Sequence, residues 1–324
     1  MGPEIPVTGW WTLGLSFTPD GLVHYFARQG TEELSREDYI ATAMPYGYRC
    51  EELRSFFYNV VNGDKEAVDA LLDSPVVQAV SFVGSTPIAE SIYTRGCANG
   101  KRVQALGGAK NHMLVLPDAD VAMAADAAVS AAYGSAGERC MAISVAVAVG
   151  DVADPLVAAI RERMAKIKVG PGTDDSNEMG PLITREHRDK VASYVANAAT
   201  EGATVAVDGR GAIRRDGFFL EPSLLDNVAT GMRCYKDEIF GPVAAVIPFD
   251  DEADAIRICN DSPYGLSGSV WTRDGARSLR VVRAMETING GFASPAPALS
   301  ASAACCALSI KSCHLFLSWY NNCI

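Results

Sequence analysis

The sequence predicts an α/β protein in which helices cover a layered sheet. Three observations support this fold class. Helical and strand-like patterns alternate from about residue 59 to residue 290. Glycine, proline and aspartate residues separate the short apolar runs. The chain has 324 residues, of which 48% are hydrophobic and 21% are charged, and it is therefore long enough to bury a sizeable core in about two domains.

The segment SFVGSTPIAESIY, residues 81–93, predicts a strand, a tight turn and a helix. Gly84 lets the backbone turn, and Pro87 suits the first helical position. Ser85 or Thr86 can cap the helix. A helix start of this kind presents N–H groups that can hold a phosphate, although most such turns only connect two elements. No GxGxxG motif accompanies the turn.

Further helices and strands follow along the chain. Residues 119–133 predict an alanine-rich helix. A second helix is predicted with Asp154 as its cap and Pro155 at its first position, and a third begins at Thr184. Strands are predicted at four apolar runs, ISVAVAV (143–149), ATVAV (203–207), AAVIPF (244–249) and GSVWT (268–272).

Composition limits the class of function. The formal net charge of −11 disfavours a nucleic acid or an anionic membrane as partner, because both attract clustered lysine and arginine. We expect a small-molecule partner instead. The N-terminal segment MGPEIPVTGWW lacks the basic and apolar regions of a signal peptide, so we expect a cytoplasmic protein.

The nine cysteines include no CxxC pair, and no metal site is predicted. A scattered cysteine is most often a small buried hydrophobe. Cys140 differs because it lies between Arg139 and Met141, after a loop of small and charged residues and directly before an apolar run. The pattern changes there from helix to strand, and a loop cysteine of this kind needs a further explanation.

Seven short motifs follow one another between residues 82 and 272: FVGST (82–86), LGGAKNHMLVLPDAD (106–120), GSAGERCMAIS (134–144), VGPGTDDSNEMGPLIT (169–184), GFFLEPSLLDNV (217–228), DEIFGPVAAVIPFDDEADAI (237–256) and NDSPYGLSGSVWT (260–272). In this order and spacing they resemble the aldehyde dehydrogenase superfamily. Within it, GERCMA and GGAKNH most closely resemble the CoA-acylating methylmalonate-semialdehyde dehydrogenases. The resemblance implies an aldehyde dehydrogenase-like fold, with an incomplete Rossmann-like cofactor domain and an α/β catalytic domain.

The resemblance covers roughly residues 59 to 290 and divides the chain into four parts. Residues 1–58 are an unassigned, aromatic-rich segment, and residues 59–130 are a remnant of the NAD-binding domain. Residues 131–290 are the catalytic domain. Residues 291–324 are rich in alanine, serine and cysteine and hold no stretch of about 20 apolar residues, so we expect a disordered or sticky tail rather than a membrane anchor.

The resemblance implies that Cys140 is the nucleophile. Its thiolate attacks an aldehyde, a hydride passes to NAD, and a thioester remains on the cysteine. Arg139 can lower the pKa of the thiol or bind the carboxylate of a semialdehyde acid. A solvated surface arginine is the alternative interpretation.

The resemblance also implies an NAD site. Gly84 and Ser85 match the pyrophosphate site, and Leu106 lies where a backbone group meets the nicotinamide end. Glu238 and Phe240, in EIFGP, match the contacts to the nicotinamide ribose. The alternatives are that Glu238 caps a helix and that Phe240 belongs to the core.

One departure from the wider superfamily points to coenzyme A as acyl acceptor. Members that release a free acid carry a glutamate two residues before Gly-Gly, and this chain has Ala105 there. Without that carboxylate, no base activates water to hydrolyse the thioester, so transfer to another thiol is favoured. The alternative is that Ala105 only fills space and another residue serves as base.

Two expected features of the superfamily are absent. The PWNFP segment and the lysine-bearing strand do not precede residue 59, and the pattern ends after Thr287, before the oligomer-forming strand of this homo-oligomeric family. We therefore expect a truncated or chimeric chain that oxidises aldehydes poorly. The alternative functions are a catalytically impaired fragment that keeps the fold without dehydrogenase activity, and a fusion whose aromatic N-terminal segment binds something else.

Overall fold

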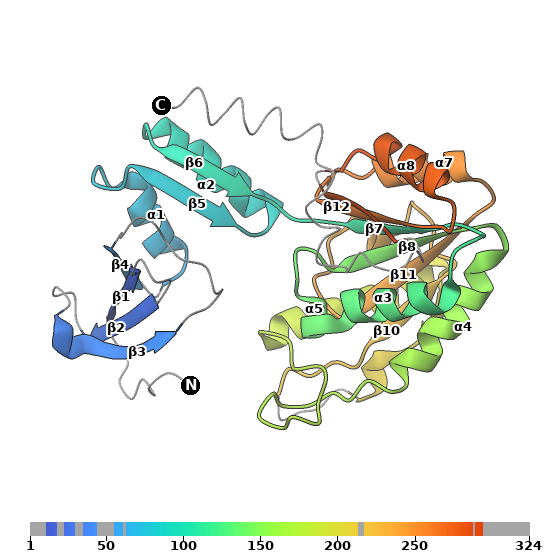
Figure 1. Ribbon diagram of the computed structural model, residues 1–324, viewed down its shortest axis with the longest axis horizontal. Coiled ribbons are helices and arrows are strands. Elements are labelled where there is room, and N and C mark those ends of the chain that lie inside the picture. The colour runs from blue at the N-terminus through green and yellow to red at the C-terminus, as the bar shows by residue number, and fades with distance from the viewer. Residues whose placement is uncertain are drawn as a thin grey trace. The chain divides into compact units, whose positions relative to one another are not determined.

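A computed structural model describes residues 11–17, 23–29, 35–43, 55–60, 63–212, 217–287 and 289–293 (Figure 1). The chain divides into two compact units, Met1–Gly107 and Gly108–Ile324, and each is described by itself. The expected tail begins at residue 291, but Asn289–Ala293 form a strand, and residues 294–324 lie outside the described residues. Residues 1–10 of the N-terminal segment MGPEIPVTGWW also lie outside them.

Four antiparallel strands open the first unit. They are β1 (Trp11–Phe17), β2 (Val23–Gln29), β3 (Tyr39–Ala43) and β4 (Ser55–Val60), in the sheet order β3-β2-β1-β4. A 3-10 helix, Arg36–Asp38, precedes β3. The sequence pattern did not predict this sheet, because aromatic residues follow one another without regular spacing. Aromatic and β-branched residues nevertheless favour strands, which accounts for the sheet.

The rest of the first unit has helices α1 (Lys65–Asp73) and α2 (Thr86–Ala98) and two parallel strands, β5 (Ala79–Val83) and β6 (Arg102–Leu106). The predicted strand, turn and helix at 81–93 are therefore present. Ser85 is the N-cap of α2, but its side chain makes no capping hydrogen bond, and Pro87 is the second residue of the helix rather than the first. Gly84 does not adopt a positive φ; a Cβ atom there would lie 2.5 Å from the Phe82 ring.

A seven-stranded sheet forms the centre of the second unit. Its strands are β7 (Asn111–Val115), β8 (Ile143–Val149), β9 (Thr204–Val207), β10 (Ser223–Asp226), β11 (Val243–Phe249), β12 (Ser267–Trp271) and β13 (Asn289–Ala293), in the order β13-β12-β7-β8-β11-β10-β9. All neighbours are parallel except β9, which pairs antiparallel with β10 at one edge. The four strands predicted from apolar runs are all present in this sheet. Because β7 lies between β12 and β8, residues 108–130 belong to this unit, and the division into compact units falls after Gly107 rather than at residue 130.

Helices cover both faces of this sheet (Figure 1). They are α3 (Val121–Tyr133), α4 (Ala153–Met164), α5 (Arg185–Glu201), α6 (Arg233–Lys236), α7 (Glu252–Asn260) and α8 (Gly275–Ala284). In this strand order, the connection through α3 leads from β7 to β8, toward the β9 edge. The connections through α7 and α8 lead from β11 to β12 and from β12 to β13, toward the opposite edge. Right-handed crossovers therefore place α3 on one face and α7 and α8 on the other.

Two predicted helix starts have different outcomes. Thr184 is the N-cap of α5, as predicted, and its hydroxyl accepts a hydrogen bond from the N–H of His187. The prediction of Asp154 as a cap is wrong, because a 3-10 turn, Gly150–Val152, leads directly into α4, and Val152 is the N-cap. Among the described helices, none combines the length and the apolar character that a bilayer crossing requires.

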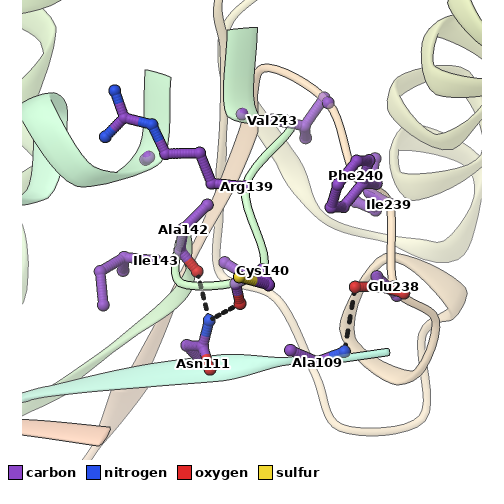
Figure 2. Close-up of a pocket in the computed structure, with 14 residues that line it drawn as sticks. Ala109, Asn111, Arg139, Cys140, Ala142, Ile143, Glu238, Ile239, Phe240 and Val243 are labelled. Carbon is purple, nitrogen blue, oxygen red and sulfur yellow. Dashed lines mark hydrogen bonds between the residues drawn. The ribbon is translucent and has the colours of Figure 1, made fainter. Parts of the chain in front are cut away.

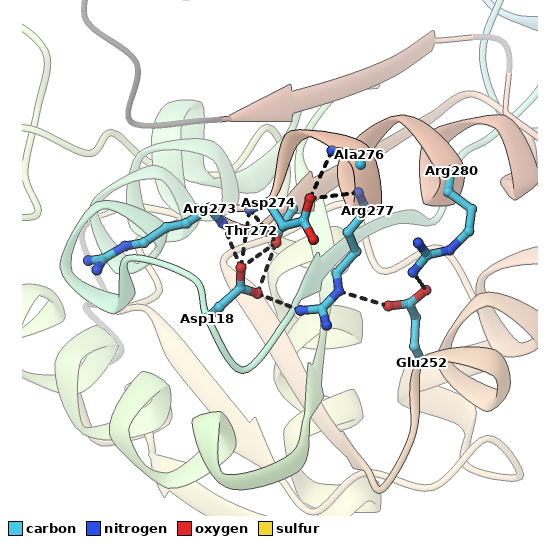
Figure 3. A network of polar contacts seen from close by, with 8 residues as sticks. All are labelled: Asp118, Glu252, Thr272, Arg273, Asp274, Ala276, Arg277 and Arg280. Carbon is cyan, nitrogen blue, oxygen red and sulfur yellow. Dashed lines mark hydrogen bonds and ion pairs between the residues drawn. The ribbon is translucent and has the colours of Figure 1, made fainter.

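A polar network joins the ends of β7 and β12 (Figure 3). The Asp118 carboxylate accepts hydrogen bonds from the Thr272 hydroxyl at 2.7 and 2.9 Å, from the Arg273 N–H at 3.0 Å and from Arg277 at 2.9 Å. Partial burial opposes ionisation of Asp118, but these hydrogen bonds outweigh it and lower the pKa of the carboxyl group. Arg277 also pairs with Glu252 at 3.3 Å, so the network extends from the sheet to α7 and α8.

Candidate active site

A tightly folded segment joins α3 to β8 and leads to Cys140. Ser135 and Ala136 adopt positive φ angles of 52° and 54°, and Gly137 follows at 72°. A Cβ atom at Gly137 would lie 2.3 Å from the carbonyl oxygen of Gly241, so only glycine fits. The chain therefore reverses sharply after α3 and packs its backbone against Gly241.

Cys140 lies in a turn directly before β8. The N–H of Ala142 donates to the carbonyl oxygen of Arg139 over 3.1 Å, which closes a four-residue turn around Cys140 and Met141. The Cys140 side chain is exposed. The prediction that this cysteine occupies a loop before the strand at 143–149 is confirmed.

The other described cysteines differ in their exposure. Cys97 is exposed on α2, whereas Cys234 and Cys259 are buried. Burial raises the pKa of the Cys234 thiol and raises that of Cys259 to about 12. The two buried thiols are therefore poor nucleophiles, since the thiolate is the reactive form.

Cys140 lines a pocket together with two other segments (Figure 2). One is the chain around the start of β7, with Ala109 and Asn111, and the other is the loop from Glu238 to Gly241 that leads into β11. The structure thus brings together the predicted site residues Arg139, Cys140, Glu238 and Phe240.

The Glu238 carboxylate is fixed by the backbone before β7. Its Oε1 atom accepts a hydrogen bond of 2.9 Å from the N–H of Ala109. A Cβ atom at Gly108 would lie 2.3 Å from Oε2, so the carboxylate packs directly against this glycine. Glu238 therefore does not cap a helix, and among the described ion pairs none involves it.

Lys110 holds the chain that precedes Glu238. Its Nζ atom donates to the carbonyl oxygens of Cys234 and Asp237, both at 2.7 Å. The residue is 3% exposed, and burial lowers the pKa of its amine to about 8. Two carbonyl acceptors satisfy the buried amine, so Lys110 links β7 to the loop at 237–241.

Phe240 has a left-handed backbone that a histidine supports. Its φ is 55°, and its side chain is 40% exposed, so it does not belong to the core. The Nε2 atom of His187 lies 2.6 Å from the Phe240 carbonyl oxygen. A carbonyl only accepts, so this nitrogen carries the hydrogen. The Glu138 carboxylate lies 3.6 Å from the same nitrogen, and burial raises the pKa of Glu138.

Arg139 is exposed at the rim of the pocket. Its Nε donates to the Ser135 hydroxyl over 3.2 Å, and the guanidinium extends away from Cys140 in Figure 2. It forms no ion pair with any described residue. The guanidinium therefore remains available to bind an anion from solution.

The remaining predicted site residues, Gly84, Ser85 and Leu106, lie in the first unit. The N–H of Gly84 donates to the carbonyl oxygen of Leu106 over 3.1 Å, which brings the ends of β5 and β6 together. The Leu106 side chain is 51% exposed, and Ser85 precedes the first turn of α2. Gly84, Ser85 and Leu106 therefore meet at the carboxyl edge of a parallel pair, beside a helix N-terminus.

Three residues that organise the pocket were not predicted as site residues. They are Lys110, Asn111 and His187. The one available signal was the polar run KNH at 110–112 in front of an apolar strand, because polar side chains at a buried strand start need partners. Nothing in the sequence near His187 indicated its contact with Phe240.

Comparisons with known proteins agree with this fold. Residues 54–296 match the family model described as the aldehyde dehydrogenase family. The chain is 53% identical over 221 residues to a malonate-semialdehyde dehydrogenase of Pseudomonas aeruginosa and 45% identical over 235 residues to one of Halalkalibacterium halodurans. These alignments cover 67% and 72% of this chain but 44% and 48% of the relatives.

Solved structures give the same result. Methylmalonate-semialdehyde dehydrogenase from Oceanimonas doudoroffii matches with a TM-score of 0.70 and 50% identity, over 72% of this chain and 49% of that one. A putative methylmalonate-semialdehyde dehydrogenase from Sinorhizobium meliloti, complexed with NAD, matches with a TM-score of 0.71 and 43% identity, over 74% of this chain and 50% of that one. The chain thus spans about half the length of the relatives it matches. On the matched segment, the aligned sequence and the shared fold, this chain belongs to the aldehyde dehydrogenase family.

Proposed function

We propose that this chain takes part in the NAD-dependent, CoA-acylating oxidation of a (methyl)malonate-semialdehyde-type aldehyde, through a thioester on Cys140. The observation that carries the proposal is the exposed Cys140 in a turn that opens on a pocket with Glu238 and Phe240. The substrate class comes from the names of the relatives, which are malonate-semialdehyde and methylmalonate-semialdehyde dehydrogenases. The proposal includes a small-molecule aldehyde as partner and a cytoplasmic location.

Each unit, taken by itself, carries residues whose chemistry suits part of a dinucleotide. The Glu238 carboxylate belongs to none of the described ion pairs, and its fixed position suits a hydrogen bond from a ribose hydroxyl. The Phe240 ring is exposed beside it. In the first unit, Gly84 and Ser85 lie at a helix N-terminus, which favours a phosphate, and Leu106 lies beside them. When bound, NAD supplies the hydride acceptor.

The chemistry begins at the Cys140 sulfur. The thiolate attacks the aldehyde carbon, a C–S bond forms, and the carbonyl oxygen takes the negative charge. After oxidation, the acyl group is a thioester on Cys140. A CoA thiolate then attacks the acyl carbon, and the Cys140 thiolate leaves. Ala105, half-buried in β6, provides no carboxylate to activate water, which favours transfer to a thiol over hydrolysis.

Arg139 would bind the carboxylate of a semialdehyde acid. Its guanidinium is exposed and has no acidic partner among the described residues, but it points away from Cys140, so the side chain would turn toward the pocket to make this contact. Guanidinium and carboxylate groups form charge-assisted, bidentate hydrogen bonds. This contact would select a short aldehyde that carries an acid group.

The test measures NADH formation by the purified chain with NAD, CoA and malonate or methylmalonate semialdehyde. The matched control is Cys140→Ser, which keeps the shape and removes the sulfur. NADH formation that CoA stimulates and that the control lacks would support the proposal. Equal NADH formation by both proteins would reject Cys140 as the nucleophile. No NADH from either protein would reject the proposal and favour the alternative, a chain that keeps the fold without dehydrogenase activity.

A further inference from the structure

Asn111, the first residue of β7, is in contact with the turn that carries Cys140. The residue is 1% exposed. Its Nδ2 atom donates to the carbonyl oxygens of Cys140 and Ala142, both at 2.8 Å (Figure 2). The orientation of the amide follows from these partners, because two carbonyl oxygens can only be bound by the NH₂ end.

These hydrogen bonds complete the fixation of the backbone around Cys140. A peptide group is planar, so a hydrogen bond to its carbonyl oxygen fixes the whole unit. The peptide group before Cys140 is fixed by the bond from the Ala142 N–H to the Arg139 carbonyl oxygen, at 3.1 Å. The peptide group after Cys140 is fixed by Asn111. Together they determine the direction in which the Cys140 side chain leaves the backbone.

The oxygen end of the Asn111 side chain indicates that this residue serves to hold the turn in place rather than to add stability. Its Oδ1 atom is buried and has no hydrogen-bond partner in the described structure. An unsatisfied buried acceptor costs stability, and an apolar side chain of similar size would avoid that cost. Asparagine at this position is therefore explained by what its NH₂ group holds, which is the turn at residues 139–142.

We propose that Asn111 is a positioning residue that orients the Cys140 thiolate for attack on a carbonyl carbon. It acts through the backbone carbonyl oxygens of Cys140 and Ala142 and does not touch the reacting atoms. The inference rests on the proposed function only in that Cys140 is taken as the nucleophile. It does not require NAD, CoA or turnover.

The experiment compares two reactions of the Cys140 thiolate. In acylation by p-nitrophenyl acetate, the thiolate attacks the ester carbonyl, a thioester forms and p-nitrophenolate leaves. In alkylation by iodoacetamide, the thiolate displaces iodide. Addition to a carbonyl depends on the direction of approach and on nearby N–H donors, whereas alkylation requires mainly an accessible thiolate. Both rates are proportional to the fraction of Cys140 present as thiolate, so this fraction cancels in their ratio at each pH. Cys97 on the same molecule serves as the reference thiol.

The test variants are Asn111→Leu, which keeps the approximate shape, and Asn111→Ala, in case the leucine does not fit. The matched control is Asn260→Leu. Asn260 donates to the carbonyl oxygen of Ala284 over 2.8 Å and accepts from the N–H of Glu286 over 2.9 Å, away from the Cys140 pocket. Both substitutions remove two side-chain bonds to the backbone, so both reduce stability. Circular dichroism verifies that each variant is folded.

We expect the acylation-to-alkylation ratio at Cys140 to fall about tenfold in the Asn111 variants, the shift that corresponds to one or two lost neutral hydrogen bonds. The ratio should stay unchanged in Asn260→Leu. A ratio within about twofold of the parent in a folded Asn111 variant would overturn the proposal, as would a parent protein whose Cys140 is not acylated at all. Acylation of Cys140 in a chain that forms no NADH would reject the proposed function and leave the role of Asn111 standing.

Discussion

The seven-stranded sheet of the second unit and the two-stranded sheet β5–β6 of the first hold their predicted site residues in different ways. Every residue of β7 is buried, and so are the last five residues of β8. In β5 and β6, exposed and half-buried residues alternate, and Val83 and Leu106 are 62% and 51% exposed. Cys140 and Glu238 therefore rest on strands that are covered on both faces, whereas Gly84 and Leu106 rest on a sheet with an exposed face.

This difference in burial implies that the position of Cys140 depends more strongly on core packing than the position of the proposed phosphate site does. A close-packed interior transmits small changes in its strands to the loops attached to them. A half-exposed pair of strands has fewer packed neighbours to transmit such changes. We therefore expect substitutions in and around β7 and β8 to destabilise the protein, and matched substitutions on β5 and β6 to have little effect on stability.

The largest effect is expected from a matched pair of leucine truncations. Leu114→Ala, in β7, removes a side chain that is 0% exposed and should lower the free energy of unfolding by about 3 kcal/mol. Leu106→Ala, in β6, removes one that is 51% exposed and should cost less than about 1 kcal/mol. Urea unfolding followed by circular dichroism measures both. Similar losses of unfolding free energy in the two variants would contradict the claim that β7 is packed more tightly than β6.

A smaller effect is expected from the polar groups of the two units. Asp118→Ala leaves the Thr272 hydroxyl and the Arg273 N–H without their carboxylate acceptor, and should cost about 1 to 2 kcal/mol. Asp73→Ala, in the first unit, removes an exposed partner of Arg95 and should cost less, because water solvates that pair. Thermal unfolding midpoints test the order, and a lower midpoint for Asp73→Ala than for Asp118→Ala would reverse it.

Near neutral pH the smallest effect is expected from His112, because its contribution to stability changes only as the pH falls. Burial, with the neighbouring Lys110 charge, lowers the pKa of His112 from 6.5 to about 4. Between pH 6.5 and about 4, His112 is protonated in the unfolded chain but neutral in the folded chain. The free energy of unfolding therefore falls as the pH decreases through this range. His112→Phe keeps an aromatic edge against Tyr235 and removes the titration.

The measurement for His112 is the slope of the unfolding free energy against pH. Between pH 6.5 and about 4, the slope of the variant should be shallower than that of the parent by up to about 1.4 kcal/mol per pH unit. The carboxyl groups contribute equally to both proteins, so the difference isolates the histidine. Parallel slopes would mean that solvent reaches His112, which would weaken the contrast between the two sheets.

Much of the second unit could be predicted because its signals are local. The apolar runs at 143–149 and 244–249 lie within β8 and β11, since a strand buried on both faces shows a continuous apolar pattern. Thr184 marked the start of α5 because a cap is formed within one turn. The exposed turn at Cys140 followed from the change of pattern at that point.

The parts that could not be predicted depend on contacts far apart in the sequence. Lys110 binds the Cys234 carbonyl oxygen 124 residues away, and Asn111 binds that of Cys140 29 residues away. Backbone acceptors carry no sequence signature, so neither partner could be named in advance. The unit boundary after Gly107 was missed for a similar reason, because only the sheet order places β7 beside β8.

The central claim is that Cys140 forms the thioester, and one trapping experiment tests it most directly. The protein is mixed with NAD and malonate semialdehyde without CoA and quenched in acid, and peptide mass spectrometry then locates the acyl group. The account predicts an acyl group on the Cys140 peptide, which disappears when CoA is added before the quench and is absent from Cys140→Ser. An acyl group on Cys97 instead, or an unmodified Cys140 in the folded protein, would contradict the account.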